Sequence, residues 1–342
     1  MKIAIHSSKI SYSERWIAYC KKNQIPYKIV DCCKSDIIKQ LEDCDGLMWH
    51  FYQASPKDYL CAKQILYSVQ ASGKKVFPDF NTCWHFDDKL GQKYLLEAKG
   101  APLVPSYVFY SKAEALQWVN QIAFPKVFKL RGGASSDNVK LVRSRRQAAR
   151  LIKKAFGSGF RRYDPWGGLK ERWRRIKLGK SNFTELFEAL GHFLIKTDFE
   201  KIAGKDKGYV YFQDFVEGCT FDIRVKVIGD RCWAFKRLVR ENDFRASGSD
   251  SHIYSPQDIP LEVVKIAFAI SKELALECVA FDFVISKENI PFLLEMSYGF
   301  GFTEDQFYGY WDPEMKWHEG TFNPFGWLVE SLIKDIKNSQ SK

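Results

Sequence analysis

Two strand-like runs late in the chain, VAFDFVI (279–285) and PFLLEMS (291–297), most restrict what this sequence can form. Both are apolar enough to be buried strands, yet each carries one carboxylate, Asp282 in the first and Glu295 in the second. A two-residue turn at Glu288-Asn289 would place Asp282 directly opposite Glu295, with Cβ atoms about 4.5–5.5 Å apart on one face. The sequence therefore predicts a hairpin that holds paired acids in an apolar sheet.

Paired carboxylates in such a place repel each other and lose hydration, which is costly unless a cation compensates them. A hard divalent cation with oxygen ligands meets this need, and Mg²⁺ is the common choice beside phosphates. Ser297 lies two residues beyond Glu295 on the same face and would add a hydroxyl. Two alternatives stay open, because the acids could instead face solvent or pair with arginine.

A second hairpin is predicted from TFDIRVKVI (220–228) and RCWAFKRLV (231–239), joined by Gly229-Asp230, a pair suited to a type II′ turn. Alternation puts Asp222, Arg224 and Lys226 on one face, with Arg237 opposite Asp222 and Phe235 opposite Arg224. This face would present a cationic surface for a phosphate or a carboxylate. A solvated outer face is the alternative interpretation.

The first 80 residues alternate short apolar runs with helical segments, which predicts a small parallel sheet with helices on its faces. No GxGxxG follows the first strand, where His6-Ser7-Ser8-Lys9 stands instead, so a dinucleotide site is not favoured. From Asp87 onward the pattern changes to helices and strands of a second kind. We interpret the first region as a scaffold or an acceptor-binding domain.

Lys129 ends an apolar strand, PKVFKL (125–130), just before the loop RGGASSDN (131–138). The small residues Gly132, Gly133 and Ser135 would let backbone N–H groups approach phosphate oxygens, while Lys129 supplies a charge. No GKS or GKT follows this loop directly, so it is not a Walker A sequence. An ordinary turn is the alternative.

Composition excludes several classes of protein. With 342 residues, 46% hydrophobic and 15% aromatic, the chain can form two or three packed domains and is not disordered. No apolar run approaches the roughly 20 residues of a membrane-spanning helix, and the start, MKIAIHSS, leads directly into a strand. The nine cysteines form no CxxC pair, which is typical of reduced thiols. We therefore expect a cytoplasmic protein.

The net charge of +11 is concentrated in one segment. Residues 143–180 contain 14 Lys or Arg and two acids, so the rest of the chain is nearly neutral. A uniformly cationic nucleic-acid binder would look different, and we do not expect a nucleic-acid ligand. Aromatic residues are interleaved with these cations, as at Trp166 and Trp173, which suits a stacking platform for a sugar or a polyanion. A solvated helix face is the alternative.

Taken in this order, the motifs resemble the ATP-grasp superfamily, in the branch of the ribosomal-protein glutamate ligase and bacterial glutathione synthetase. Segments such as KVFPDFNTCWHFDDK and EMSYGFG also resemble a subgroup that occurs with bacterial surface-polysaccharide genes. The resemblance implies an α/β chain in which a small parallel domain precedes an ATP-grasp domain of two α+β lobes. The expected divisions are residues 1–84, residues 85–216 with a basic insertion at 157–207, and residues 217–342 with the metal site. The matching runs lie at 87–109, 124–142, 211–230, 236–248 and 279–297.

Site residues follow from the same resemblance. Lys89 and Lys129 would contact the phosphates of ATP, and the loop with Gly132, Gly133 and Ser135 would close over them. Arg224 and Arg245 would steady the transferred phosphoryl group, and Asp282 and Glu295 would hold Mg²⁺. Family members usually have Asn where this chain has Ser297, which puts a second metal position in doubt. The strand that reads adenine would contain Gln213, Asp214, Phe215 and Val216.

The implied activity is ATP-dependent joining of a carboxylate and an amine through an acyl phosphate, with ADP as a product. This chemistry needs Mg²⁺ and cations and no covalent nucleophile, which agrees with the absence of GxSxG and of a recognisable Ser/His or Cys/His constellation. A uronic-acid-bearing glycan or its precursor is the acceptor that the subgroup implies, and a homo-oligomer is compatible with the sequence. The alternatives are an ATP-binding protein without ligase activity, a peptide or amino-acid ligase unrelated to glycans, a nucleic-acid binder and a kinase-type phosphotransferase.

Overall fold

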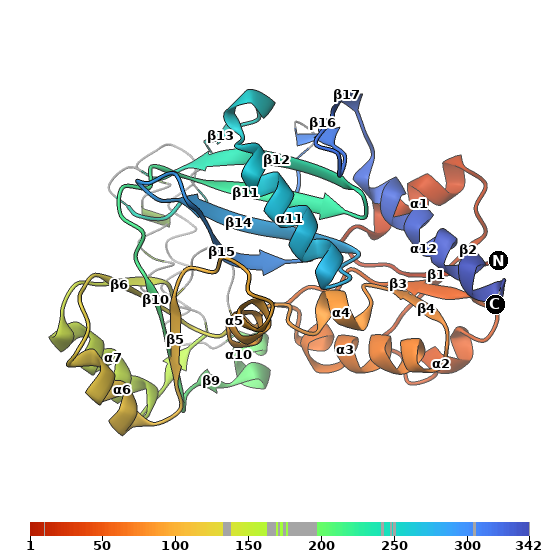
Figure 1. The fold of residues 1–342 in the computed structure, drawn as a ribbon. Helices are drawn as coiled ribbons and strands as arrows, with labels where there is room; N and C mark the ends of the chain where they lie inside the picture. The colour runs from red at the N-terminus through yellow and green to blue at the C-terminus, as the bar shows by residue number, and fades with distance from the viewer. Residues whose placement is uncertain are drawn as a thin grey trace. The chain divides into compact units, whose positions relative to one another are not determined.

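The computed structural model describes residues 1–9, 11–132, 138–162, 169, 172–173, 176, 197–240, 243–246, 248, 251–303 and 306–341 (Figure 1). The chain folds into two compact units. Unit 1 combines residues 1–86 with 219–342, and unit 2 consists of residues 87–218. Of the three expected domains, the first and the third both fall in unit 1. The expected α/β architecture is confirmed.

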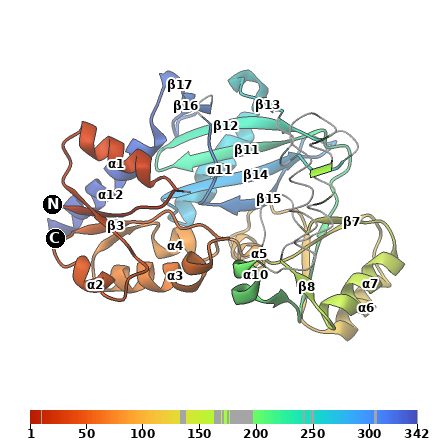
Figure 2. The same cartoon turned by 180° about the vertical axis from the view of Figure 1, so that it is seen from behind.

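The N-terminal part of unit 1 is a parallel sheet in the order β2-β1-β3-β4. Its helices lie on both faces, with α1 and α12 on one side and α2 and α3 on the other (Figures 1 and 2). This is the arrangement that the strand–helix alternation predicts. The strands are β1 (Ile3–His6), β2 (Tyr27–Val30), β3 (Gly46–Met48) and β4 (Lys75–Phe77). The helices are α1 (Ser13–Lys22), α2 (Ile37–Gln40), α3 (Pro56–Ala71), α4 (Phe80–Cys83) and α12 (Pro324–Gln340).

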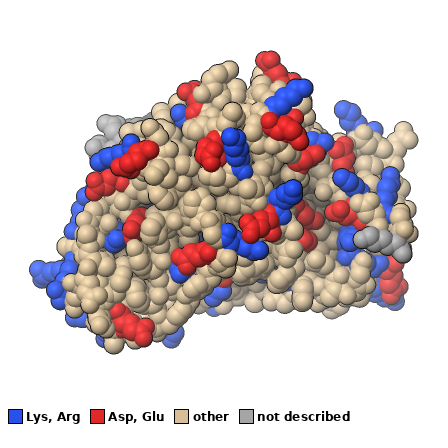
Figure 3. Space-filling model, in the orientation of Figure 1, with Lys and Arg blue, Asp and Glu red and all other residues tan. Residues whose placement is uncertain are grey.

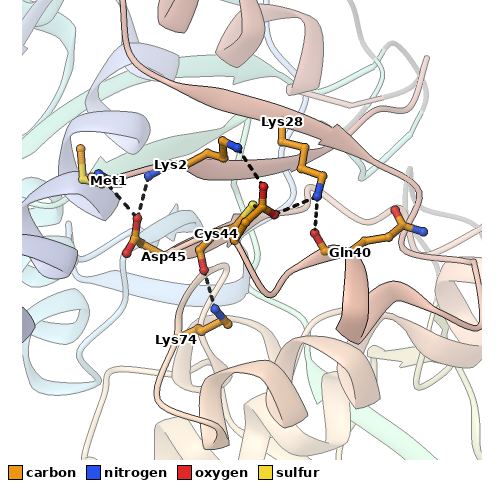
Figure 4. Close-up of polar contacts among 8 residues, drawn as sticks. Met1, Lys2, Lys28, Gln40, Cys44, Asp45 and Lys74 are labelled. Carbon is orange, nitrogen blue, oxygen red and sulfur yellow. Dashed lines mark hydrogen bonds and ion pairs between the residues drawn. The ribbon is translucent and has the colours of Figure 1, made fainter.

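Charged groups hold together the segments that enter this sheet (Figure 4). The Asp43 carboxylate lies 2.8 Å from Lys2 Nζ and 2.8 Å from Lys28 Nζ. The backbone N–H of Lys2 donates to Asp45 at 2.7 Å, and Lys74 Nζ donates to the carbonyl of Cys44. We call Lys2, Lys28 and Asp43 the entry cluster. Its side chains are 36–50% exposed, so water screens these ion pairs.

The second sheet of unit 1 is antiparallel, in the order β15-β14-β11-β12-β16-β17 with β13 beside β12. Helix α11 (Leu261–Glu273) covers one face (Figure 1). The predicted hairpin of β11 and β12 is confirmed, because Asp222 pairs with Arg237, Arg224 with Phe235, and Ile228 with Arg231 across the Gly229-Asp230 turn. The strands are β11 (Phe221–Ile228), β12 (Arg231–Leu238), β13 (His252–Ile253), β14 (Cys278–Ile285), β15 (Pro291–Ser297), β16 (Tyr308–Trp311) and β17 (Trp317–Thr321). A short 3-10 helix, η1 (Pro256–Asp258), precedes α11.

The chain between β15 and β16 must cross a face of this sheet, because β15 lies at one end of the strand order and β16 pairs with β12 near the other. We call residues 298–303 the crossing loop. Its Tyr298 and Phe300 belong to the same hydrophobic core as Trp233 and Ala280 of the sheet. That core extends into the N-terminal sheet, which explains why the two sheets form one unit.

Unit 2 contains an antiparallel sheet in the order β5-β10-β6-β7. Its core joins the strands to helices α6 and α7, through side chains such as Phe128, Phe212, Ala115 and Ile152. The strands are β5 (Ser106–Phe109), β6 (Lys126–Lys129), β7 (Lys140–Val142), β8 (Phe160–Arg161), β9 (Lys205–Asp206) and β10 (Val210–Asp214). The helices are α5 (Lys89–Ala98), α6 (Lys112–Val119), α7 (Arg145–Ala155) and α10 (Asp198–Ala203). Among the described residues, no helix combines the length and the apolar character needed to cross a membrane.

Candidate functional site

In unit 1 the two predicted acids face each other. Asp282 of β14 pairs with Glu295 of β15, as the sequence predicts, but the expected two-residue turn is wrong. Ser286 N–H donates to the Ile290 carbonyl at 2.9 Å, which closes a longer turn with Asn289 at φ 61°. A register shift between Asp282 and Phe283 then restores the opposed acids. Thus a β-bulge compensates for the extra turn residue.

Asp282 is almost fully buried and is bound by two arginines. Arg224 donates from Nε at 2.7 Å and from a terminal nitrogen at 2.6 Å, and Arg237 lies 2.8 Å away. Arg237 also bonds Asp222 at 2.6 and 2.7 Å. We call Asp222, Arg224, Arg237 and Asp282 the charged network. Burial alone would raise the pKa of Asp282, but Arg224 and Arg237 hold it below its usual range. For Asp282, the arginine-paired alternative is therefore what the structure contains.

The same face differs from the cationic surface that alternation predicted. Asp222 and Arg237 are buried, and Lys226 is not exposed at all. Only Arg224 keeps an appreciable exposed fraction, 24% of its side chain. The broad cationic surface was therefore wrong, because strand alternation identifies a shared face but not what covers it. Of the predicted cationic surface, only Arg224 is partly exposed, and it is bound to the buried charged network.

Glu295 and Ser297 supply the other oxygen atoms. Both side chains are partly buried. Ser297 pairs with Ala280, two residues along the strands from the pair of Asp282 and Glu295, so it lies on the same face. The Ser297 hydroxyl donates weakly to the Gly299 carbonyl at 3.4 Å. Two opposed carboxylates and a hydroxyl are a donor set that fits Mg²⁺. The described residues contain no cluster of three or more His, Cys, Asp and Glu side chains that could hold a metal.

Arg245 lies in unit 1 and is bound to a neighbouring acid. Its guanidinium contacts Asp243 at 2.9 and 2.6 Å. Burial would raise the pKa of Asp243, but the pairing with Arg245 outweighs it and lowers that pKa. Arg245 therefore has a fixed carboxylate partner, and the role that the resemblance implies for it remains a prediction.

In unit 2, Lys129 and Gln213 are brought together. Lys129 is buried at the end of β6, and its Nζ donates to Gln213 Oε1 at 2.6 Å. The Gln213 amide in turn donates to the Ser106 hydroxyl at 3.0 Å, which fixes its orientation. Buried polar groups need such partners. Lys129 and Gln213 thus bind each other inside unit 2, and the nucleotide contacts that the resemblance implies for them remain predictions.

The predicted adenine-reading segment is divided by the end of β10. Asp214 is the last strand residue, its N–H donates to the Pro105 carbonyl at 2.9 Å, and its carboxylate pairs with Lys126. Phe215 and Val216 follow the strand and are partly buried. The side chain of Asp214 is therefore committed to Lys126.

Lys89 and Gly132 lie close together in unit 2. Lys89 begins α5, and its backbone N–H donates to the Arg131 carbonyl at 2.9 Å. A Cβ at Gly132 would lie 2.7 Å from Asp87 Oδ2, so the carboxylate end of Asp87 lies against this glycine and would have to move for any larger residue. Gly133 and Ser135 lie outside the described residues. The sequence missed that the Asp87 carboxylate lies against Gly132 and that the neighbouring Asp88 pairs with Arg131.

The basic segment is described only in part. Of its cations, Arg161 pairs with Glu200 at 2.8 Å, whereas Arg174 and Arg175 lie outside the described residues. Trp173 is 47% exposed. On the face drawn in Figure 3, cationic and anionic side chains are interspersed. The prediction of an acceptor platform in this segment therefore stays a prediction.

The sequence places Arg237 and Lys226 on the correct face of the β11–β12 hairpin but predicts no role for them in the site. Arg237 is the buried partner of two acids, and Lys226 is a buried cation. The sequence signal that could have found them is the grouping of three cations, Arg224, Lys226 and Arg237, with one acid, Asp222, on a single predicted sheet face.

Comparison with known proteins gives matches at the level of structure only. No family model matches the chain, and no curated protein matches by sequence. A RimK domain ATP-grasp protein from Sphaerobacter thermophilus has a TM-score of 0.54 at 14% identity, covering 88% of this chain and 92% of that one. D-alanine–D-alanine ligase from Bacillus anthracis has a TM-score of 0.55 at 17% identity, covering 99% of both chains. Biotin carboxylase from Campylobacter jejuni has a TM-score of 0.61 at 12% identity, covering 96% and 70%. The chain therefore has the ATP-grasp fold.

Proposed function

We propose that this protein is an ATP-dependent carboxylate–amine ligase. The observation that carries the proposal is the opposed pair Asp282 and Glu295 beside the partly exposed Arg224, on neighbouring strands of one sheet. A cation and two carboxylates in this geometry suit the transfer of a phosphoryl group. The similarity to a D-alanine–D-alanine ligase over 99% of both chains supports the same class of reaction.

In this proposal the residues of unit 2 bind the nucleotide. Lys129 and Lys89 would contact phosphate oxygens, and the loop at Gly132, with Gly133 and Ser135, would add backbone N–H groups. The Gln213 side chain would support the nucleotide site by holding Lys129, because its amide is bound to Ser106 and its oxygen to Lys129. Because Asp214 is bound to Lys126, adenine would be read by backbone groups near Phe215 and Val216 and not by that carboxylate.

Asp282, Glu295 and Ser297 would hold Mg²⁺, and their donor set fits that ion. The bound ion would neutralise charge on the phosphates. Arg224 now shares Asp282 with Arg237, so its guanidinium could turn to the phosphoryl group while Arg237 keeps Asp282 paired. Arg245 would provide a second cation for the same group. These side chains would thus bind and orient the phosphoryl group without forming a covalent bond to it.

The reaction balances in two steps. The carboxylate oxygen attacks the γ-phosphorus of ATP, which forms an acyl phosphate and releases ADP. The amine then attacks the acyl carbon, and phosphate leaves as the amide forms and the amine loses a proton. The protein's task is to place both substrates and to exclude water from the acyl phosphate.

We further propose that the carboxylate belongs to a uronic-acid-bearing glycan or its precursor in the cytoplasm. The support is the sequence resemblance and the interleaved cations and aromatic residues of 143–180. A peptide or amino-acid ligase is the alternative within the same reaction class. A ligase assay with each class of acid separates the two.

An ATP-binding protein without ligase activity is a second candidate. Two observations favour it, the arginine-bound state of Asp282 and the serine at position 297. It predicts that Mg-ATP binds and raises the unfolding temperature, with no turnover.

Trapping with hydroxylamine tests the ligase proposal. Purified protein is incubated with Mg-ATP, a library of acids and hydroxylamine, which converts an acyl phosphate into a hydroxamate. We expect ADP and a hydroxamate that both depend on one acid, and neither product with the Asp282→Asn variant. ATP binding without acid-dependent ADP or hydroxamate across the library would support the second candidate instead.

A further inference from the structure

A fully buried ammonium group lies beside the charged network. Lys226 of β11 has no exposed surface. Its Nζ donates to the Gly301 carbonyl at 2.9 Å and to Gln306 Oε1. Three aromatic rings surround it, with centroids 4.7 Å away for Phe300, 5.2 Å for Phe235 and 5.7 Å for Trp233. These contacts join a strand of the sheet to the crossing loop, residues 298–303, and to Gln306 beyond it.

Lys226 stands at a boundary on the sheet face. It lies two residues beyond Arg224 on β11, so both side chains point to the same face. On one side of it the crossing loop covers the sheet, and on the other side lie Arg224 and Asp282. Gly301 and Thr303 of the crossing loop are themselves exposed. An exposed residue of the crossing loop, Gly301, is thus bound by a side chain two strand positions from Arg224.

Other contacts of the crossing loop do not involve Lys226. Among the described residues, the Ser297 hydroxyl donates to the Gly299 carbonyl at 3.4 Å, and Cys278 Sγ lies 3.8 Å from the Tyr298 carbonyl. Tyr12 donates its hydroxyl proton to the Phe300 carbonyl, and Tyr298 donates to the Phe51 carbonyl at 3.0 Å. Both hold the part of the loop that packs on the N-terminal sheet. Lys226 holds a different point of the loop, the exposed Gly301, from a strand position two residues from Arg224.

Packing alone does not explain a lysine at this position. Burying an ammonium group is expensive, and Arg224 and Arg237 add repulsion from nearby like charges. An apolar side chain would fill the same aromatic cage without that cost. What lysine adds is two hydrogen bonds, both made to the segment that crosses the sheet.

We propose that Lys226 is a positioning residue that fixes the crossing loop beside Arg224 and Asp282, and that this loop forms the binding wall for the carboxylate and amine substrates. The inference rests on the proposed ligase function for the substrates it names. The contact between Lys226 and the loop can be tested independently of that function.

The first experiment measures hydrogen exchange in the full-length protein. Lys226→Met keeps the length and apolar body of the side chain and removes both hydrogen bonds. We expect exchange of the backbone amides in 298–303 to accelerate about tenfold or more, while peptides from β11 and β14 stay unchanged. Lys236→Met on β12 is the matched control, because Lys236 lies over Phe221 on the other face and does not contact the loop. Unchanged exchange in 298–303 would overturn the proposal.

The second experiment measures steady-state kinetics with the acid and amine that the trapping assay identifies. We expect Lys226→Met to raise the KM values for the acid and for the amine about tenfold or more. The KM for ATP should change by less than about twofold. Equal increases for ATP and for the joined substrates would overturn the assignment of the loop to substrate binding.

A double variant tests whether the effect passes through one contact. Gln306→Leu removes the second acceptor and leaves Lys226 in place. If the two residues act together, the KM of Lys226→Met/Gln306→Leu should match that of the more severe single variant. Multiplicative effects would contradict a shared role. If the wild-type protein forms no product with any substrate, the ligase proposal fails, and hydrogen exchange still decides whether Lys226 fixes the loop.

Discussion

Unit 1 contains two clusters of ion pairs with opposite physical character. In the entry cluster, Asp43 is shared by Lys2 and Lys28, and all three side chains are 36–50% exposed. In the charged network, Asp222, Arg237 and Asp282 are each less than a tenth exposed. The contact distances are similar, 2.8 Å in the first and 2.6–2.8 Å in the second. Geometry therefore does not distinguish the clusters, but solvent does.

The difference in solvent exposure indicates different reasons for their presence. Exposed pairs contribute little, because water and salt screen them. Buried pairs lose so much hydration that well-packed apolar residues of equal volume are often as stable. The charged network therefore does not follow from the needs of folding. It does suit a site in which Arg224 must stay poised beside a carboxylate, and this is why we place the chemistry there.

The largest expected effect is on turnover, from Asp282→Asn. We expect kcat to fall by about 10²-fold to 10³-fold or more, because the variant loses a charge that Mg²⁺ and Arg224 would both contact. The measurement is acid-dependent ADP release at saturating Mg²⁺. Wild-type rates in this variant would show that Asp282 is not a metal ligand.

A control for stability is available within the same network. Asp222→Asn also removes a buried carboxylate partner of Arg237, so each variant should lose about 3 kcal/mol of unfolding free energy. Only Asp282→Asn should lose turnover at a temperature where both are folded. Equal loss of activity in the two variants would mean that Asp282 acts through stability.

Glu295→Gln should separate catalysis from stability further. Glu295 is only partly buried, whereas Asp282 is almost fully buried, so we expect a smaller loss of stability than for Asp282→Asn. Turnover should still fall by about 10²-fold, because a neutral amide is a poor ligand for Mg²⁺. Ser297→Ala should show a milder loss, since water can replace one hydroxyl ligand. A Glu295→Gln variant as active as the wild type would remove Glu295 from the metal site.

Glu277 offers a third case, a carboxyl group with little cationic compensation. Desolvation, followed by repulsion from Asp79, raises its pKa well above the ordinary value. Its Oε2 accepts a hydrogen bond from the Asp79 N–H at 2.8 Å. Because the folded-state pKa lies above the unfolded one, its favourable contribution is present below about pH 4.3 and declines as pH rises. We expect Glu277→Gln to raise the unfolding temperature by about 2 °C at pH 8 and to have no such effect near pH 4. An equal effect at both pH values would contradict the raised pKa.

Local sequence patterns predicted what lies within one hairpin. Strand alternation and the Gly229-Asp230 pair were enough to place Arg237 opposite Asp222. They could not place Arg224 opposite Asp282, because this pairing joins β11 to β14 across 58 residues of chain. The partner of Asp282 therefore depends on strand order, which local periodicity does not encode.

Burial of the cationic face was also beyond the sequence. Lys226 is covered by the crossing loop, and the course of that loop follows from the positions of β15 and β16 in the sheet. The turn after β14 was missed for a local reason, since Asn289 takes a left-handed conformation that a longer turn requires. The sequence therefore missed the burial of Lys226 because that burial depends on tertiary neighbours. It missed the turn after β14 because the conformation of one turn residue was not foreseen.

The smallest expected effect completes the comparison, from Asp43→Asn in the entry cluster. Lys2 and Lys28 lower the pKa of Asp43, so its contribution to stability is full above about pH 4 and declines as pH falls below that value. Because the cluster is exposed, we expect only a small decrease in unfolding temperature at pH 7, and we expect high salt to remove it. The measurement is thermal unfolding of wild type and variant at low and high salt. A large, salt-independent loss would show that solvent exposure does not separate the two clusters, and burial would then give no reason to place the chemistry at the charged network.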